Sequence, residues 1–190
     1  MDYWFNTNVE DSLQSSLKLA QTIFRDTEQE AENMGVRIGS ALASSKIDPQ
    51  NELALEQLFA QILKNTPPGV PDALSLVDNS PRDIVSIRGP RLLSTTIPDV
   101  PTEALRLAQN REKPEVITQK AGIGELVRSI IHLRLPGIDG TSYFLVTSLL
   151  IPAEQLTRMQ TISEGLNDYR QLVMLKAPIK LSLIIMLLII

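Results

Sequence analysis

The chain has 190 residues, which is long enough for one domain with a hydrophobic core. Its net charge of −4 gives no sign of the basic surface that binds nucleic acid. It contains no cysteine, which excludes disulfides, cysteine metal ligands and thiol catalysis. Its single histidine excludes a multi-histidine zinc site and argues against a Ser-His-Asp triad.

The first 47 residues predict a long amphipathic helix that leaves a membrane. Apolar residues recur at steps of three and four over residues 3–45, which predicts a helix about 60 Å long. Trp4 and Phe5 stand at its start, where aromatic side chains suit a membrane–water interface. Gly35 and Gly39 weaken the helix and predict a bend.

A second helix and a sheet are expected next. Asp48 is placed to cap the second helix, with Pro49 at its first position. An antiparallel sheet of about five strands is expected, with strands at 74–78, 83–88, 114–120, 125–135 and 141–150. Residues 92–97 are a candidate for a further strand, and a short helix is expected over 101–110. The segment 141–150 is apolar on both faces, which predicts a central strand.

The C-terminal part predicts a helix that runs into a membrane. Pro152 opens the helix, and from Leu181 onward the chain is uncharged and almost wholly aliphatic. Since a span needs about 20 apolar residues, this shorter run predicts the start of a transmembrane helix, with Lys176 and Lys180 at the membrane interface. A buried C-terminal helix or strand is the alternative.

Both ends carry a family resemblance. The opening stretch 3–13, YWFNTNVEDSL, resembles the segment that leaves the membrane in NtrY-type nitrogen-regulation sensor histidine kinases. The closing stretch 169–182, YRQLVMLKAPIKLS, is similar to the segment of that family that re-enters the membrane. The middle of the chain is only compatible with the family.

The resemblance implies a bacterial inner-membrane receptor, most of this segment being extracytoplasmic. It implies an α+β fold in which a long N-terminal helix packs on a PAS-like or Cache-like antiparallel sheet. The expected divisions are a stalk (1–47), a sensor core (48–151), an output helix (152–176) and the start of a membrane helix (177–190).

The resemblance also implies partners outside this chain. The parent protein would be a protein-histidine kinase that phosphorylates an NtrX-type response regulator, with ATP and magnesium only in its kinase domain. Independently of the resemblance, the long N-terminal helix is expected to pair with its copy in a homodimer, because its apolar steps at Phe5, Val9, Leu13 and Leu17 suit helix–helix packing. None of the kinase catalytic motifs lies in these residues, so this segment is not expected to be an enzyme, to hold a cofactor or to bind a metal.

One strand face is the candidate ligand site. Arg128, His132 and Arg134 alternate along 125–135 and would share a face, to which Arg88 on another strand could add. Arginine pairs bidentately with carboxylate or phosphate, so a small anion is the expected ligand. Tyr143, beside the turn at residues 139–140, could line the cleft. A hydrated sheet face without a ligand is the alternative.

Three functions remain open from the sequence. The first is the sensing segment of a two-component histidine kinase. The second is a membrane-anchored structural or interaction protein that uses its long helix for docking. The third is the sensor domain of a chemotaxis receptor or a cyclase.

Overall fold

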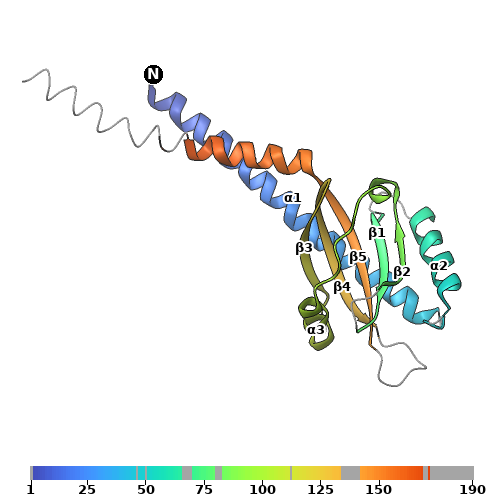
Figure 1. The fold of residues 1–190 in the computed structure, drawn as a ribbon. Coiled ribbons are helices and arrows are strands. Elements are labelled where there is room, and N and C mark those ends of the chain that lie inside the picture. The colour runs from blue at the N-terminus through green and yellow to red at the C-terminus, as the bar shows by residue number, and fades with distance from the viewer. Residues whose placement is uncertain are drawn as a thin grey trace, which may run out of the picture. The chain divides into compact units, whose positions relative to one another are not determined.

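A computed structural model describes residues 2–45, 47–49, 51–65, 70–79, 83–111, 113–133, 142–168 and 171. Its elements (Figure 1) are helices α1 (Asp2–Ser44), α2 (Glu52–Asn65) and α3 (Thr102–Asn110), the 3-10 turn η1 (Pro90–Leu92), strands β1 (Ala73–Val77), β2 (Asp83–Arg88), β3 (Glu115–Ala121), β4 (Gly124–Leu133) and β5 (Tyr143–Pro152), and a helix over residues 153–168.

The chain divides into two compact units. One comprises Met1–Phe24 and Glu154–Ile190, and the other comprises Arg25–Ala153. In the first unit, Leu166 on the helix 153–168 is buried. The second unit contains the sheet. The functional division into stalk, core, output helix and membrane helix stays a prediction, and residues 177–190 lie outside the described part of the chain.

The five strands form one antiparallel sheet in the order β2-β1-β5-β4-β3. The predicted α+β fold with an antiparallel sheet is therefore confirmed. Strand β5 is central, as its pattern predicted: every residue from Tyr143 to Ile151 is buried. A strand buried on both faces must be apolar on both, which explains the unbroken run of large side chains.

The cross-strand register shows that the sheet has two differently covered faces. On one face, α3 packs its buried residues Ala104 and Leu105 against Ile130 and Phe144. We call this the α3 face. On the other face, which we call the α1 face, Gly35 of α1 lies against Ser129 and Ile131. The side chains of β4 therefore alternate between two faces, as predicted from the sequence, and each face is covered by a different helix.

The second half of α1 is a core element of the sheet unit. Its residues Ala31, Met34, Ile38 and Leu42 are all buried and follow one another at steps of three and four. This spacing places them on one side of the helix. The helix α1 is continuous through Gly35 and Gly39, and a bend there stays a prediction. Gly35 allows close approach to the sheet, since a Cβ at position 35 would lie 2.7 Å from Ser129 Oγ.

Two local expectations were wrong. The helix α2 begins at Glu52, and the side chain of Asn51, not Asp48, accepts a hydrogen bond from the Ala54 amide at 3.1 Å. An asparagine in that position satisfies an amide that the helix leaves unpaired. The strand expected over 92–97 is absent: η1 ends at Leu92, and irregular chain follows.

Candidate functional site

The register places the candidate ligand residues on opposite faces of the sheet. Arg88 pairs across β1 and β5 with Arg128, through Ala73 and Ser148, so both arginines lie on the α3 face. Directly opposed residues of antiparallel strands share a face, which fixes this assignment. His132 lies on the same face, four residues after Arg128.

Tyr143 lies on the other side of the sheet. It pairs with Leu133 and therefore belongs to the α1 face, away from both arginines. Its side chain is buried, and this burial raises the pKa of the phenol, with a further contribution from the negative charges of Asp48 and Asp78. Arg134 lies outside the described residues. The structure thus brings Arg88, Arg128 and His132 to one face but does not bring Tyr143 to them.

Arg128 is the most buried charged residue of this group. Its exposure is 2%, and its guanidinium donates from Nη1 to the Pro98 carbonyl and to Gln119 Oε1, both at 2.7 Å. Its Nε is buried and has no hydrogen-bond partner. Burial lowers the pKa of Arg128 to about 10, while the carboxylates of Asp83 and Asp99 act in the opposite direction.

Both arginines bind the segment that follows η1. Residues 95–99, which we call the strap, connect η1 towards α3. Arg88 Nη1 donates to the Thr95 carbonyl at 3.0 Å, and Arg128 binds the Pro98 carbonyl. Gln119 Nε2 donates to the Asp99 carbonyl at 2.9 Å. Three side chains from β2, β3 and β4 therefore hold main-chain oxygens of the strap.

His132 lies beside a cavity of about 550 Å³ at the edge of the sheet. The cavity opens where β4 extends beyond its last pair with β3, Glu115↔Ile130. Its walls include Gly39 and Ser40 of α1 and Arg111 after α3. The imidazole also packs against Phe144, with ring centroids 5.3 Å apart. His132 and Arg128 thus have different surroundings although they share a face.

The residues expected at a membrane interface are only partly described. Trp4 and Phe5 lie in α1, but their side chains are outside the described part, as are Lys176 and Lys180 altogether. In the ranges that the structure describes, no helix has the length and apolar content needed to cross a bilayer.

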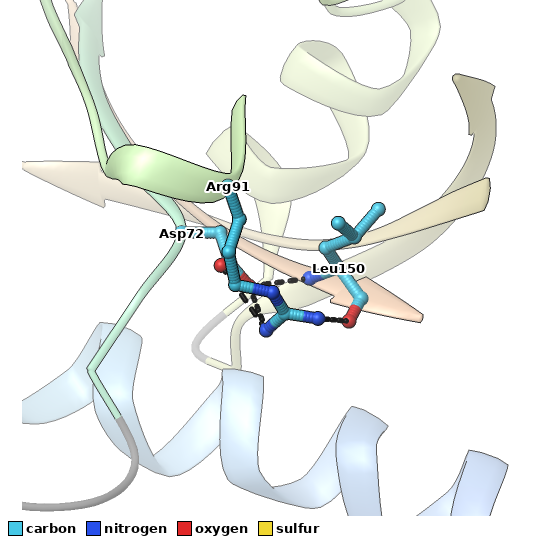
Figure 2. Close-up of polar contacts among 3 residues, drawn as sticks. All are labelled: Asp72, Arg91 and Leu150. Carbon is cyan, nitrogen blue, oxygen red and sulfur yellow. Dashed lines mark hydrogen bonds and ion pairs between the residues drawn. The ribbon is translucent and has the colours of Figure 1, made fainter. Parts of the chain in front are cut away.

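The sequence analysis missed an ion pair at the end of β5. Asp72 Oδ2 accepts a hydrogen bond from the Leu150 amide at 2.8 Å, and Arg91 Nη2 donates to the Leu150 carbonyl at 3.1 Å (Figure 2). Arg91 Nη1 also lies 3.2 Å from both Asp72 carboxylate oxygens. Nothing in the local sequence points from Arg91 to β5.

Comparisons with known proteins give little further information. No family model matches the chain, and no curated protein matches it. Among solved structures, the periplasmic domain of LuxQ from Vibrio cholerae is similar with a TM-score of 0.36 and 10% sequence identity, over 84% of this chain and 71% of that one. At this TM-score the likeness carries no weight, so the fold assignment rests on the strand order and register.

Proposed function

We propose that this chain is the extracytoplasmic sensing segment of a membrane-bound two-component sensor histidine kinase. In this proposal the segment itself catalyses no reaction, and it passes the state of its sheet to kinase domains outside the chain. The kinase domains would use ATP and magnesium and would phosphorylate a response regulator. The finer assignment to nitrogen regulation, with an NtrX-type regulator, is supported by the resemblance of the two end segments.

The connection between sheet and output helix is the observation that carries the proposal. The central strand β5 ends at Pro152, and the helix 153–168 begins at the next residue, without a loop. The Ala153 amide donates to the Ile123 carbonyl at 2.9 Å, which ties the start of this helix to the β3–β4 turn. In this proposal the helix carries a shift of β5 towards the kinase domains, and movement of a helix as a rigid body is one of the known ways to transmit a conformational change.

The strap supports a sensing role for the sheet. The strap crosses the α3 face and is held by side chains of three strands, β2, β3 and β4. A change at the strap can therefore reach β4, which pairs with β5 along ten residue pairs from Gly124↔Pro152 to Leu133↔Tyr143. Strands β4 and β5 thus form one continuous hydrogen-bonded ladder that ends at Pro152.

The cheapest test is the coding sequence beyond Ile190. Helical linker and histidine-kinase motifs with an ATP-binding domain are the expected outcome. A stop codon soon after the apolar tail favours the docking-protein alternative. Methylation helices or a cyclase signature favour the third alternative.

A second test examines the relay directly in the parent kinase. Each alanine inserted after Gly165 rotates the following part of the helix by about 100°. We expect one or two inserted alanines to change autophosphorylation in membranes strongly, whereas seven, which restore the helical phase to within about 20°, leave it near the wild-type level. Activity that is independent of insertion length would contradict a rigid-helix relay.

A further inference from the structure

Arg128 is a buried cation without a close counter-ion. The described residues form three ion pairs, Arg91–Asp72, Arg111–Glu115 and Arg158–Glu154, and Arg128 belongs to none of them. Its acceptors, the Pro98 carbonyl and the Gln119 amide, are both neutral. Burying a charge is costly unless it is paired with an opposite charge and fully hydrogen-bonded, and Arg128 also leaves Nε without a partner.

Arg88 and Arg128 lie on the same face of the sheet and bind the same segment from β2 and β4, the strands on either side of β1 and β5. They are three strands apart, so their Cα atoms are separated by about 14 Å. The two residues between them, Ala73 and Ser148, are small, which leaves room for main chain above the sheet. The strap occupies this room, and it presents the Thr95 and Pro98 carbonyls to the two guanidinium groups.

A carboxylate would be a better acceptor for these guanidinium groups than the strap carbonyls. Hydrogen bonds between guanidinium and carboxylate are charge-assisted and roughly twice as strong as bonds to neutral acceptors. A carboxylate can also accept from two nitrogens of one guanidinium, including a nitrogen such as Nε of Arg128 that has no partner here. It would supply the negative charge that the buried guanidinium lacks.

We propose that Arg88 and Arg128 form a binding site for a small monocarboxylate, and that the strap occupies this site until the ligand displaces it. The pair of carboxylates nearby sets the ligand class. Asp83 and Asp99 interact electrostatically with Arg128 without forming an ion pair with it. These two carboxylates repel a second negative charge on a ligand, so the site favours a monoanion over phosphate or a polycarboxylate.

By displacing the strap, the ligand would change the structure of the protein. The strap is anchored at both ends by buried side chains, Leu92 and Val100, while Thr96 and Asp99 between them are exposed. Release of its middle would therefore leave the flanking η1 and α3 packed on the sheet. The signalling consequence rests on the proposed sensing function, whereas binding itself can be measured without a kinase.

The test is a thermal-unfolding titration of the 190-residue chain in mild detergent with sodium propionate, against sodium chloride at equal ionic strength. Propionate is expected to raise the Tm beyond the salt control. Arg88→Gln and Arg128→Gln are expected to weaken propionate binding about tenfold or more, since each removes a charged donor. Arg106→Gln, which replaces an exposed arginine on α3, is the matched control and should bind normally.

Gln119→Ala distinguishes strap displacement from simple binding. Gln119 holds the strap through Asp99 and also accepts from Arg128, so its removal should raise propionate affinity. Hydrogen exchange should show faster exchange of strap amides when propionate binds, with β4 and β5 unchanged. Because Gln119 is half-buried and Arg88 is exposed, these two variants keep the test valid if Arg128→Gln does not fold.

The proposal is overturned if propionate does no more than sodium chloride, or if Arg88→Gln and Gln119→Ala both bind it like the wild type. Equal affinity for inorganic phosphate contradicts the choice of a monocarboxylate. Propionate binding that leaves autophosphorylation of the parent kinase unchanged would count against the sensing function and not against the site. If propionate does not bind but the kinase relay is intact, the result would count against the site and not against the sensing function.

Discussion

Asp72 and Arg91 together satisfy both main-chain groups of a residue on β5 that no β1 residue covers. The pairing of β1 with β5 ends at Ala73↔Ser148, and Leu150 lies beyond it. The Asp72 carboxylate accepts from the Leu150 amide, and the Arg91 guanidinium donates to the Leu150 carbonyl (Figure 2). The ion pair thus provides one acceptor and one donor, as the peptide groups of a neighbouring strand would, two residues before β5 ends.

Removal of this carboxylate should destabilise the sheet unit. Asp72→Ala leaves the buried Leu150 amide without its acceptor and Arg91 without its counter-ion. We expect the free energy of unfolding to fall by about 1–3 kcal/mol in urea titrations followed by circular dichroism. The matched control is Glu154→Ala, which breaks an exposed ion pair with Arg158 and should cost about 0.5 kcal/mol or less. Equal losses in the two variants would contradict a structural role for Asp72.

The same carboxylate should make stability depend on pH. Burial raises the pKa of Asp72 above its ordinary 3.8, although the Leu150 amide and Arg91 act in the opposite direction. The folded state therefore holds this proton more tightly than the unfolded chain does. The resulting stabilisation is complete below 3.8 and is lost as the pH rises through the folded pKa.

We therefore expect the free energy of unfolding of the wild type to decrease relative to that of Asp72→Asn as the pH rises from 3.8 upward. Urea titrations at a series of pH values would measure this difference, with Asp26→Asn as a control for the loss of one exposed charge. A difference that grows in favour of the wild type with rising pH would mean that Arg91 outweighs burial. Asp83, whose pKa burial also raises, should act in the same direction.

Glycine at position 35 should stabilise the protein by allowing α1 to lie close to the sheet, and this gain should exceed the loss from its low helix propensity. Alanine in a helix interior is favoured over glycine by about 1 kcal/mol. At Gly35, however, the new Cβ would lie 2.7 Å from Ser129 Oγ and 3.1 Å from Ile131 Cδ1. We expect Gly35→Ala to destabilise by about 1–3 kcal/mol, as overpacking does.

Two further variants make this test specific. Ser129 Oγ is buried without a hydrogen-bond partner, so Ser129→Ala alone should be nearly neutral and should relieve the clash in the double variant. A double-mutant cycle should then give a coupling energy of about 0.5–3 kcal/mol. Gly165→Ala, where a Cβ meets nothing within 4 Å, should stabilise its helix. Absence of coupling would show that position 129 does not limit the approach of α1.

The sequence predicted those parts of the fold that leave a periodic signal. Alternation along 125–133 placed Arg128 and His132 on one face, and the doubly apolar segment 143–150 predicted the central strand, because each pattern reports local burial. The start of α2 was misplaced since Asp48 and Asn51 are both good caps, and only the backbone decides between them.

The sequence could not predict contacts that depend on where two strands, far apart in the chain, end relative to each other. The hydrogen bond between Asp72 and Leu150 joins residues 78 apart and exists because β1 ends before β5 does. The burial of Arg128 likewise depends on the strap, whose sequence at 92–97 was interpreted as a strand. Tyr143 was assigned to the site because it lies near a turn, but the register places it on the α1 face.

The membrane topology can be tested by labelling, because the chain has no cysteine of its own. Glu103 on α3 is exposed, so Glu103→Cys introduces one accessible thiol in the sheet unit. If this part is extracytoplasmic, a membrane-impermeant maleimide should label it in intact cells as completely as after lysis. Labelling only after lysis would place the sheet unit in the cytoplasm and contradict the proposed orientation.

The first half of α1 carries exposed apolar residues that suit pairing with a second copy of the chain. Leu19 is 62% exposed and Ile23 is 39% exposed, and their spacing of four residues places them on the same side of the helix. Of the positions first expected to pair, the side chains of Phe5, Val9 and Leu13 lie outside the described part, and Leu17 is half-buried. We therefore expect Leu19→Cys to form a disulfide-linked dimer in membranes under mild oxidation.

The matched control is Gln21→Cys, which is exposed but lies about 160° away around the helix and should cross-link much less. Equal cross-linking at the two positions would indicate random collision, and none at position 19, with full maleimide labelling of its thiol, would contradict a paired helix.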